Sequence, residues 1–141
     1  MRLPASRTLS GPGLEALSDD QLMERAHNDI VLPARERGIH LGVYGNHCVF
    51  PEEVDATATS TFFHTAEIRS ASAALESLFE NALGGLRLRS SAFKTLAEED
   101  LGLPYFGNGE GIVACLLRGG AAEFRRDDLH AMLYLPLDPR G

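Results

Sequence analysis

The chain has 141 residues, of which 13 are basic and 20 acidic, and its formal net charge is −7. This length predicts one domain, and a hydrophobic content of 44% is that of an ordinary globular protein. These values exclude a disordered tail, a collagen-like chain and a disulfide-based scaffold. The acidic balance repels phosphate, so we expect no nucleic-acid partner.

The two cysteines, Cys48 and Cys115, stand far apart in the sequence and form no Cys-x-x-Cys motif. This usage is typical of buried thiols in a reducing compartment, although a disulfide between the two stays open. No apolar run is long enough for a signal peptide or a membrane span. We therefore expect a cytoplasmic protein with no membrane contact, and we predict no cofactor and no bound metal.

The N-terminal third begins with Pro and Gly residues that predict a flexible arm over residues 1–13, followed by a single domain over 14–141. Ser18 and the two acids after it predict the start of a helix over 18–30, which we expect Pro33 and Gly38 to end. Alternating residues over 39–50, interrupted by Gly45 and Asn46, predict a β-hairpin with a two-residue turn.

The rest of the chain predicts one long helix, a shorter one and several strands. Apolar residues at helical spacing predict the long helix over 62–83, and alternation predicts a short strand over 86–89. Ser90 and Ser91 predict the cap of a helix over 91–101, and a glycine-rich loop over 102–111 follows. The apolar run 112–117 predicts a central strand, 121–126 is a strand or a short helix, and 129–137 predicts a last strand.

This order of elements predicts an α+β fold. We expect a mainly antiparallel sheet of about five strands, with the long helix and two shorter helices packed on it. No motif of an established enzyme or metal site is present in the sequence.

The first candidate site is the pair His64 and Glu67, which lie three residues apart on the long helix and can reach one point. A His-x-x-Glu pair can supply two ligands to a metal site, but such a site needs further carboxylates from neighbouring helices. The alternative is a core histidine beside a solvated glutamate.

A second candidate is Cys48, with His47 beside it, as a nucleophile and its base. Adjacent residues of a strand point to opposite faces, so a histidine from elsewhere, such as His64 or His130, would have to serve the thiol. The alternative is a buried thiol beside a surface histidine.

Two further groups are candidate binding residues. The glycine-rich segment carries Tyr105, Phe106 and Glu110 and can form a docking loop or lid. Arg87 and Arg89 form a small basic patch with Arg118 if strands 86–89 and 112–118 are neighbours. Such a patch would bind an acidic partner or an acidic face of a second copy.

These features favour a non-catalytic interaction or assembly module that binds a protein partner or a second copy of itself. It would act as an adaptor, a chaperone-like protein or a structural subunit. One alternative is a small enzyme that uses His64 and Glu67, or Cys48 with a histidine. A second alternative is a sensor domain that binds a small ligand in an apolar cavity.

Overall fold

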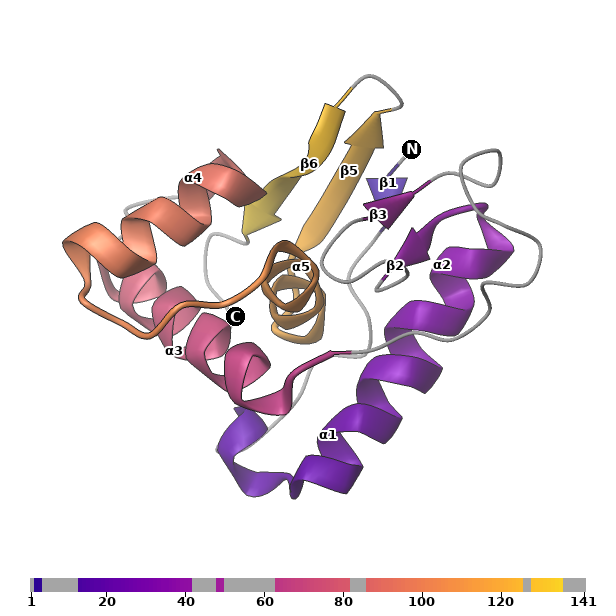
Figure 1. Cartoon of the computed structure of the whole chain (residues 1–141), viewed down its shortest axis with the longest axis horizontal. Coiled ribbons are helices and arrows are strands. Elements are labelled where there is room, and N and C mark those ends of the chain that lie inside the picture. The colour runs from indigo at the N-terminus through magenta and orange to yellow at the C-terminus, as the bar shows by residue number, and fades with distance from the viewer. Residues whose placement is uncertain are drawn as a thin grey trace.

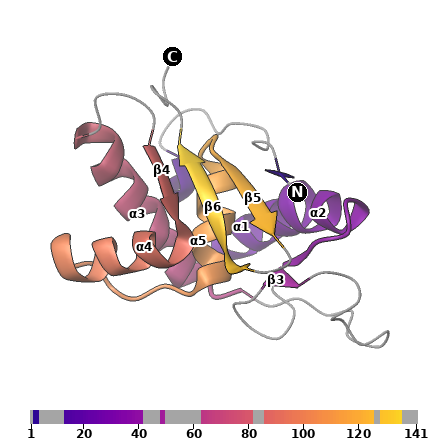
Figure 2. The ribbon, with the colours of Figure 1, turned by 90° about the horizontal axis from the view of Figure 1, so that it is seen from above.

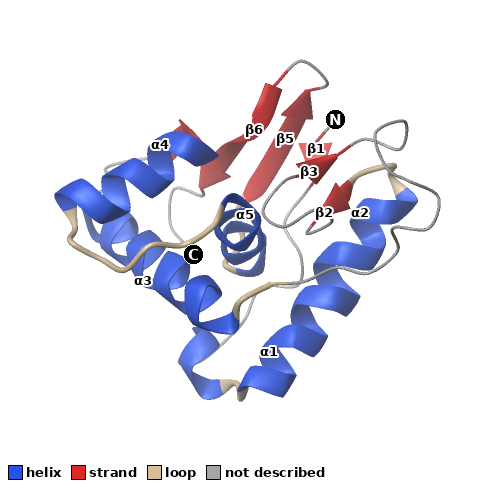
Figure 3. Ribbon diagram, viewed as in Figure 1, coloured by secondary structure: helices blue, strands red, loops and turns tan. Residues whose placement is uncertain are grey.

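The computed structural model of the chain describes residues 2–3, 13–41, 48–49, 63–81, 86–125 and 128–135. Figures 1 and 3 show the arrangement of the elements. The helical segments are η1 (Gly13–Ala16), α1 (Asp19–Ala26), η2 (His27–Val31), α2 (Leu32–Glu36), α3 (Thr65–Asn81), α4 (Ser90–Thr95), η4 (Leu96–Asp100) and α5 (Asn108–Leu117). The strands are β1 (Arg2–Leu3), β2 (His40–Leu41), β3 (Cys48–Val49), β4 (Leu86–Arg89), β5 (Ala121–Arg125) and β6 (Asp128–Leu135).

The fold is a mixture of helix and antiparallel sheet, as the sequence predicts. The main sheet has the order β1-β5-β6-β4, and β1 adds only two residues to one edge of it. Within the described residues the main sheet thus has fewer strands than the expected five. The segment 121–126, which the sequence left open, forms strand β5, and the strand predicted over 129–137 is β6.

The central strand predicted over 112–117 is wrong, because this run lies in helix α5. All ten residues of α5 are buried. A helix that is buried on every side needs no polar face, so its sequence reads as a continuous apolar run, as a buried strand does. The glycine-rich segment therefore leads into a helix, and Gly107 is its N-cap residue.

Helix α5 is the centre of the molecule, and the other elements are arranged around it (Figures 1 and 2). Strands β5 and β6 pack on one side of α5, and α3, α4 and η2 contact it elsewhere. We expected the long helix α3 to lie directly on the sheet, but its main packing partner is α5. Ile68, Leu75 and Ile112 are among the fully buried side chains of this core.

The first long helical stretch begins where the sequence predicts but does not end there. Ser18 caps α1, with Gln21 as the reciprocal partner of a capping box. The helical path continues through η2, a π-helical turn, into α2 as far as Glu36. Pro33 is tolerated because it falls at the first turn of α2, where the change of hydrogen-bond register leaves no need for its missing N–H.

The predicted hairpin is present as the antiparallel pair β2 and β3, but its register differs from the expected one. His40 pairs with Val49 and Leu41 with Cys48. A two-residue turn at Gly45 and Asn46 would have placed each partner two residues further on. The turn itself, residues 42–47, lies outside the described residues.

Three smaller expectations have separate outcomes. Strand β4 and the helix after it confirm the predictions for 86–89 and 91–101. The predicted serine cap is wrong, because Arg89 occupies the N-cap position and Ser90 already belongs to α4. In the arm expected over 1–13, Arg2 and Leu3 pair with β5, and residues 4–12 lie outside the described part of the chain.

Candidate functional site

The N-termini of α3 and α5 meet, and the predicted pair of candidate residues lies at this meeting point. His64 precedes the first residue of α3, and Gly107 is the N-cap residue of α5. No side chain of its own caps α5, because glycine has none to offer. Backbone N–H groups at a helix start need acceptors from elsewhere, so these two ends require partners.

Each helix supplies the acceptor that the other needs. Glu67, the third residue of α3, accepts a 2.7 Å hydrogen bond from the backbone N–H of Gly107 through Oε1. Glu110, the third residue of α5, accepts a 2.9 Å bond from the N–H of His64 through Oε2. In an ordinary capping box a glutamate at this position bonds to the N-cap of its own helix. Here the two boxes are exchanged between helices, and we call this arrangement the crossed caps.

Glu110 is a buried carboxyl group at the centre of the crossed caps. It is fully buried, and its Oε1 atom has no hydrogen-bond partner. Burial raises the pKa of its carboxyl above the ordinary value, and the nearby Glu67 carboxylate acts in the same direction. The hydrogen bond from the backbone of His64 opposes this rise without cancelling it.

The crossed caps leave three potential ligands together. The His64 side chain is 55% exposed, and its Nε2 lies 3.7 Å from Oε2 of Glu67. One ligand atom from each of His64, Glu67 and Glu110 lies within 4.8 Å of the other two. The structure places His64 and Glu67 side by side, and their joint action stays a prediction; the alternative of a core histidine is wrong, because the side chain of His64 is exposed.

The expectation for the glycine-rich segment is only partly met. Tyr105 is 51% exposed, as a docking residue would be, and the ammonium of Lys94 lies 4.9 Å from the centre of its ring. Phe106 is buried against Phe93, with ring centres 4.9 Å apart. Glu110 is buried in α5 and is not part of a loop.

The cysteine and arginine candidates are separated by the fold. The side chains of Cys48, His47 and His130 lie outside the described residues. Cys115 is buried in α5, and burial raises the pKa of its thiol to about 12, which makes it a poor nucleophile. The expected patch of three arginines does not form, since Arg118 is paired with Glu76 at the end of a helix.

Arg87 and Arg89 are exposed on β4, directly before α4. Arg87 lies over the ring of Tyr134 on the neighbouring strand, 5.6 Å from its centre. The acidic residues Glu98, Glu99 and Asp100 are exposed at the far end of the same helical segment, in η4.

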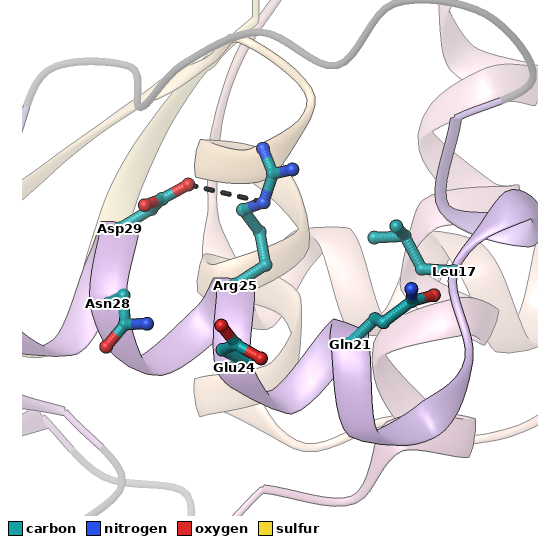
Figure 4. A pocket seen from close by; sticks show the side chains of 6 residues that line it. All are labelled: Leu17, Gln21, Glu24, Arg25, Asn28 and Asp29. Carbon is teal, nitrogen blue, oxygen red and sulfur yellow. Dashed lines mark ion pairs between the residues drawn. The ribbon is translucent and has the colours of Figure 1, made fainter.

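Two surface depressions lie away from the crossed caps. One runs along α1 and η2 and contains the 3.5 Å ion pair between Arg25 and Asp29 (Figure 4); its lining residues are Leu17, Gln21, Glu24, Arg25, Asn28 and Asp29. The other lies on the outer face of α4 and η4; its lining residues are Ser91, Ala92, Thr95, Leu96 and Asp100. The second depression follows the arginines of β4 along the helical segment and reaches the acids of η4, of which Asp100 lines it.

Comparison with known proteins adds no assignment. No protein-family model, no curated protein and no solved structure matches the chain. Among the described residues, no helix has the length and apolar character that crossing a membrane requires.

Proposed function

We propose that this chain is a non-catalytic assembly module that pairs with a second copy of itself through α4 and η4. The observation that carries the proposal is the distribution of charge along this helical segment. Exposed Arg87 and Arg89 precede its first residue, and exposed Glu98, Glu99 and Asp100 form its end.

These charges are placed the wrong way round for their own helix. A helix carries a partial positive charge at its N-terminus and a partial negative charge at its C-terminus. Basic residues at the start and acidic residues at the end therefore destabilise it. The same charges are well placed for an antiparallel neighbour, since each copy's acids then lie beside the other copy's N-terminus and arginines.

The surface between the two charged ends suits such a neighbour. Ala92 and Thr95 are small and exposed, and Leu96 is half-buried beside them in the depression on α4 and η4. Small residues allow two helices to approach closely. Figures 1 and 2 show α4 at the periphery of the molecule, and no other described helix or strand lies over its outer face.

A twofold axis through the middle of the segment makes the contact self-complementary. Arg89 of one copy then meets Glu99 of the other, and the same pair recurs on the far side of the axis. Pairing of this kind closes at two copies and leaves no open end.

The size of the contact predicts a weak complex. The 11 residues from Ser90 to Asp100 extend about 16 Å at the usual helical rise, and a helix is about 10 Å wide. Such a strip is far smaller than the roughly 800 Å² per partner of a stable interface. We expect a dissociation constant on the order of 100 µM, about 5.5 kcal/mol of binding free energy.

Sedimentation velocity from 10 µM to 1 mM chain, at low and at high salt, tests the proposal. We expect the average mass to rise with concentration in about 50 mM salt and to return to that of the monomer in about 0.5 M salt, because exposed charges are screened. Glu99→Arg should weaken the association, because it places a positive charge opposite Arg89 of the other copy. Glu24→Arg makes the same charge change at an exposed position of α1, so it is the matched control and should leave the association unchanged. A monomer at every concentration contradicts the proposal.

The alternative of a small enzyme uses His64 with Glu67, or Cys48 with a histidine. Of these side chains, the structure describes those of His64 and Glu67, which lie together at the crossed caps. The alternative of a ligand-binding sensor has no such observation among the described residues, since Phe63, Phe93 and Cys115 are buried in the hydrophobic core.

A further inference from the structure

Each glutamate of the crossed caps uses only one of its two carboxylate oxygens for capping. Capping uses Oε1 of Glu67 and Oε2 of Glu110. A glutamine would serve equally well for this purpose, because its amide oxygen accepts the same hydrogen bond. The chain instead has two carboxylates here, and Oε1 of Glu110 is buried without a partner. A buried carboxylate oxygen without a partner is costly, so it indicates a missing cation or donor.

We propose that His64, Glu67 and Glu110 bind one divalent transition-metal ion at the point where the N-termini of α3 and α5 meet. The ion takes the second oxygen of each glutamate and one imidazole nitrogen. It supplies the positive partner that the buried carboxylate lacks.

The three ligand atoms are close to the separations that a bound ion requires, and a small adjustment completes the site. Ligand atoms about 2.0–2.2 Å from a tetrahedral zinc ion stand roughly 3.3–3.6 Å apart. The pair His64 Nε2 and Glu67 Oε2, at 3.7 Å, is already close to this separation, and a carboxylate oxygen of Glu110 lies within 4.8 Å of a ligand atom from each of the other two residues. Each carboxylate is held through one oxygen by its cap, whereas the imidazole of His64 is half-exposed and is the ligand group at the surface of the site.

The local charge explains why both glutamates are needed. Each helix N-terminus contributes about half a positive charge, so the two together oppose a cation by about one unit. Two carboxylates contribute two negative charges, which leaves the site negative by about one charge before the ion binds. With a single carboxylate the site would be electrically neutral and would hold a dication poorly.

The ligand set indicates the class of ion. One imidazole nitrogen with two carboxylate oxygens suits Zn²⁺, Mn²⁺, Fe²⁺ or Co²⁺, whereas Mg²⁺ and Ca²⁺ prefer ligands that are all oxygen. Three protein ligands leave at least one coordination position, and the exposed side of His64 places it toward solvent. Water would occupy that position.

Titration of chelator-treated protein with Co²⁺, followed by visible absorption, and with Zn²⁺, followed by calorimetry, tests the site. We expect one ion per chain. His64→Ala removes a ligand from an exposed side chain while it keeps the backbone N–H that Glu110 caps, and it should weaken binding at least about 100-fold. Glu110→Gln keeps the cap but removes the ligand, and it should weaken binding as strongly.

His27→Ala is the matched control, because it removes an exposed imidazole at the C-terminal end of α1, which is not part of the proposed site. It should leave the affinity unchanged. Circular dichroism of each variant shows whether it is folded, and His64→Ala tests the site even where the buried substitution fails to fold. The proposal is overturned if neither ion binds more tightly than about 1 mM, or if His64→Ala binds as the unaltered protein does.

Discussion

The charge pattern of α4 and η4 predicts that one substitution will strengthen the fold and weaken the assembly. Glu99→Arg replaces an acid with a base in the last turn of η4, where the helix dipole favours a positive charge. It also removes the repulsion between three consecutive acids, because it places a positive charge between Glu98 and Asp100. A gain of about 0.3–1 kcal/mol in the unfolding free energy of the monomer is the expected result.

The effect on the pair of chains has the opposite sign. In the twofold arrangement the substitution turns two attractions between Arg89 and Glu99 into two repulsions. An exposed ion pair contributes about 0.2–1 kcal/mol, and a repulsion costs a similar amount. The four terms together weaken association by about 1–4 kcal/mol, which is roughly five-fold to several hundred-fold.

Two assays separate these effects. Urea unfolding at about 1 µM chain, well below the dissociation constant, measures the monomer, and a melting temperature raised by about 1–4 °C accompanies the gain. Sedimentation velocity at about 500 µM measures association. A variant that is less stable as a monomer, or that associates as strongly as the unaltered chain, refutes the reasoning.

Three further predictions concern the core and the crossed caps. In the presence of a chelator, Glu110→Gln should be at least as stable as the unaltered chain at pH 7, and this advantage should shrink as the pH falls, because protonation of a carboxyl with a raised folded-state pKa removes the burial penalty; urea midpoints from pH 7 to pH 5 check this. Gly120→Ala should lower the unfolding free energy by about 2–3 kcal/mol, because its Cβ would lie 2.5 Å from Sγ of Cys115. Gly102→Ala should cost only about 1 kcal/mol, because the space is open and only its φ of +63° opposes the change; equal urea midpoints for the two glycine variants contradict this. In a Cys48→Ser background, iodoacetamide at pH 7.5 should label Cys115 only after unfolding, and mass spectrometry that finds rapid labelling of the native chain contradicts its burial.

The sequence correctly predicts helices that have one buried and one exposed face. It fails on α5, which is buried on every side. Helix α3 shows regular helical spacing because part of its surface packs on the core, mainly on α5, while other residues, such as Ala73 and Glu76, are exposed. Helix α5 is buried all round, so neither its spacing nor its composition distinguishes it from a strand. Because 112–117 was predicted as a strand, we expected one strand too many in the sheet. For the same reason we expected Arg118 to lie beside Arg87.

The candidate site was half visible in the sequence. His64 and Glu67 lie three residues apart on a helix, so their proximity follows from local geometry alone. Glu110 joins them across 46 residues of sequence, through the contact of two helix ends. The signal for it was present once α5 is recognised as a helix, because Glu110 then has the same third position in α5 that Glu67 has in α3.

The sequence also shows the distribution of charge along α4 and η4, but it does not show which surface lies between the charged ends. Three acids at a helix end predict fraying when the chain is considered alone. The sequence already predicts that Arg87 and Arg89 precede this helix, in the strand 86–89. Only the structure shows that the segment carries a surface depression, which Ala92, Thr95 and Leu96 line.

Mixing two charge-reversed variants tests the proposed assembly most directly. Arg89→Glu and Glu99→Arg should each associate at least about five-fold more weakly alone than the unaltered chain does, because like charges meet at both contacts. An equimolar mixture restores two attractions in the mixed pair, so at about 500 µM each and low salt it should sediment as a dimer as strong as the unaltered chain. A mixture that associates no more strongly than the two variants do separately, while the unaltered chain forms dimers, would show that α4 and η4 do not form the interface.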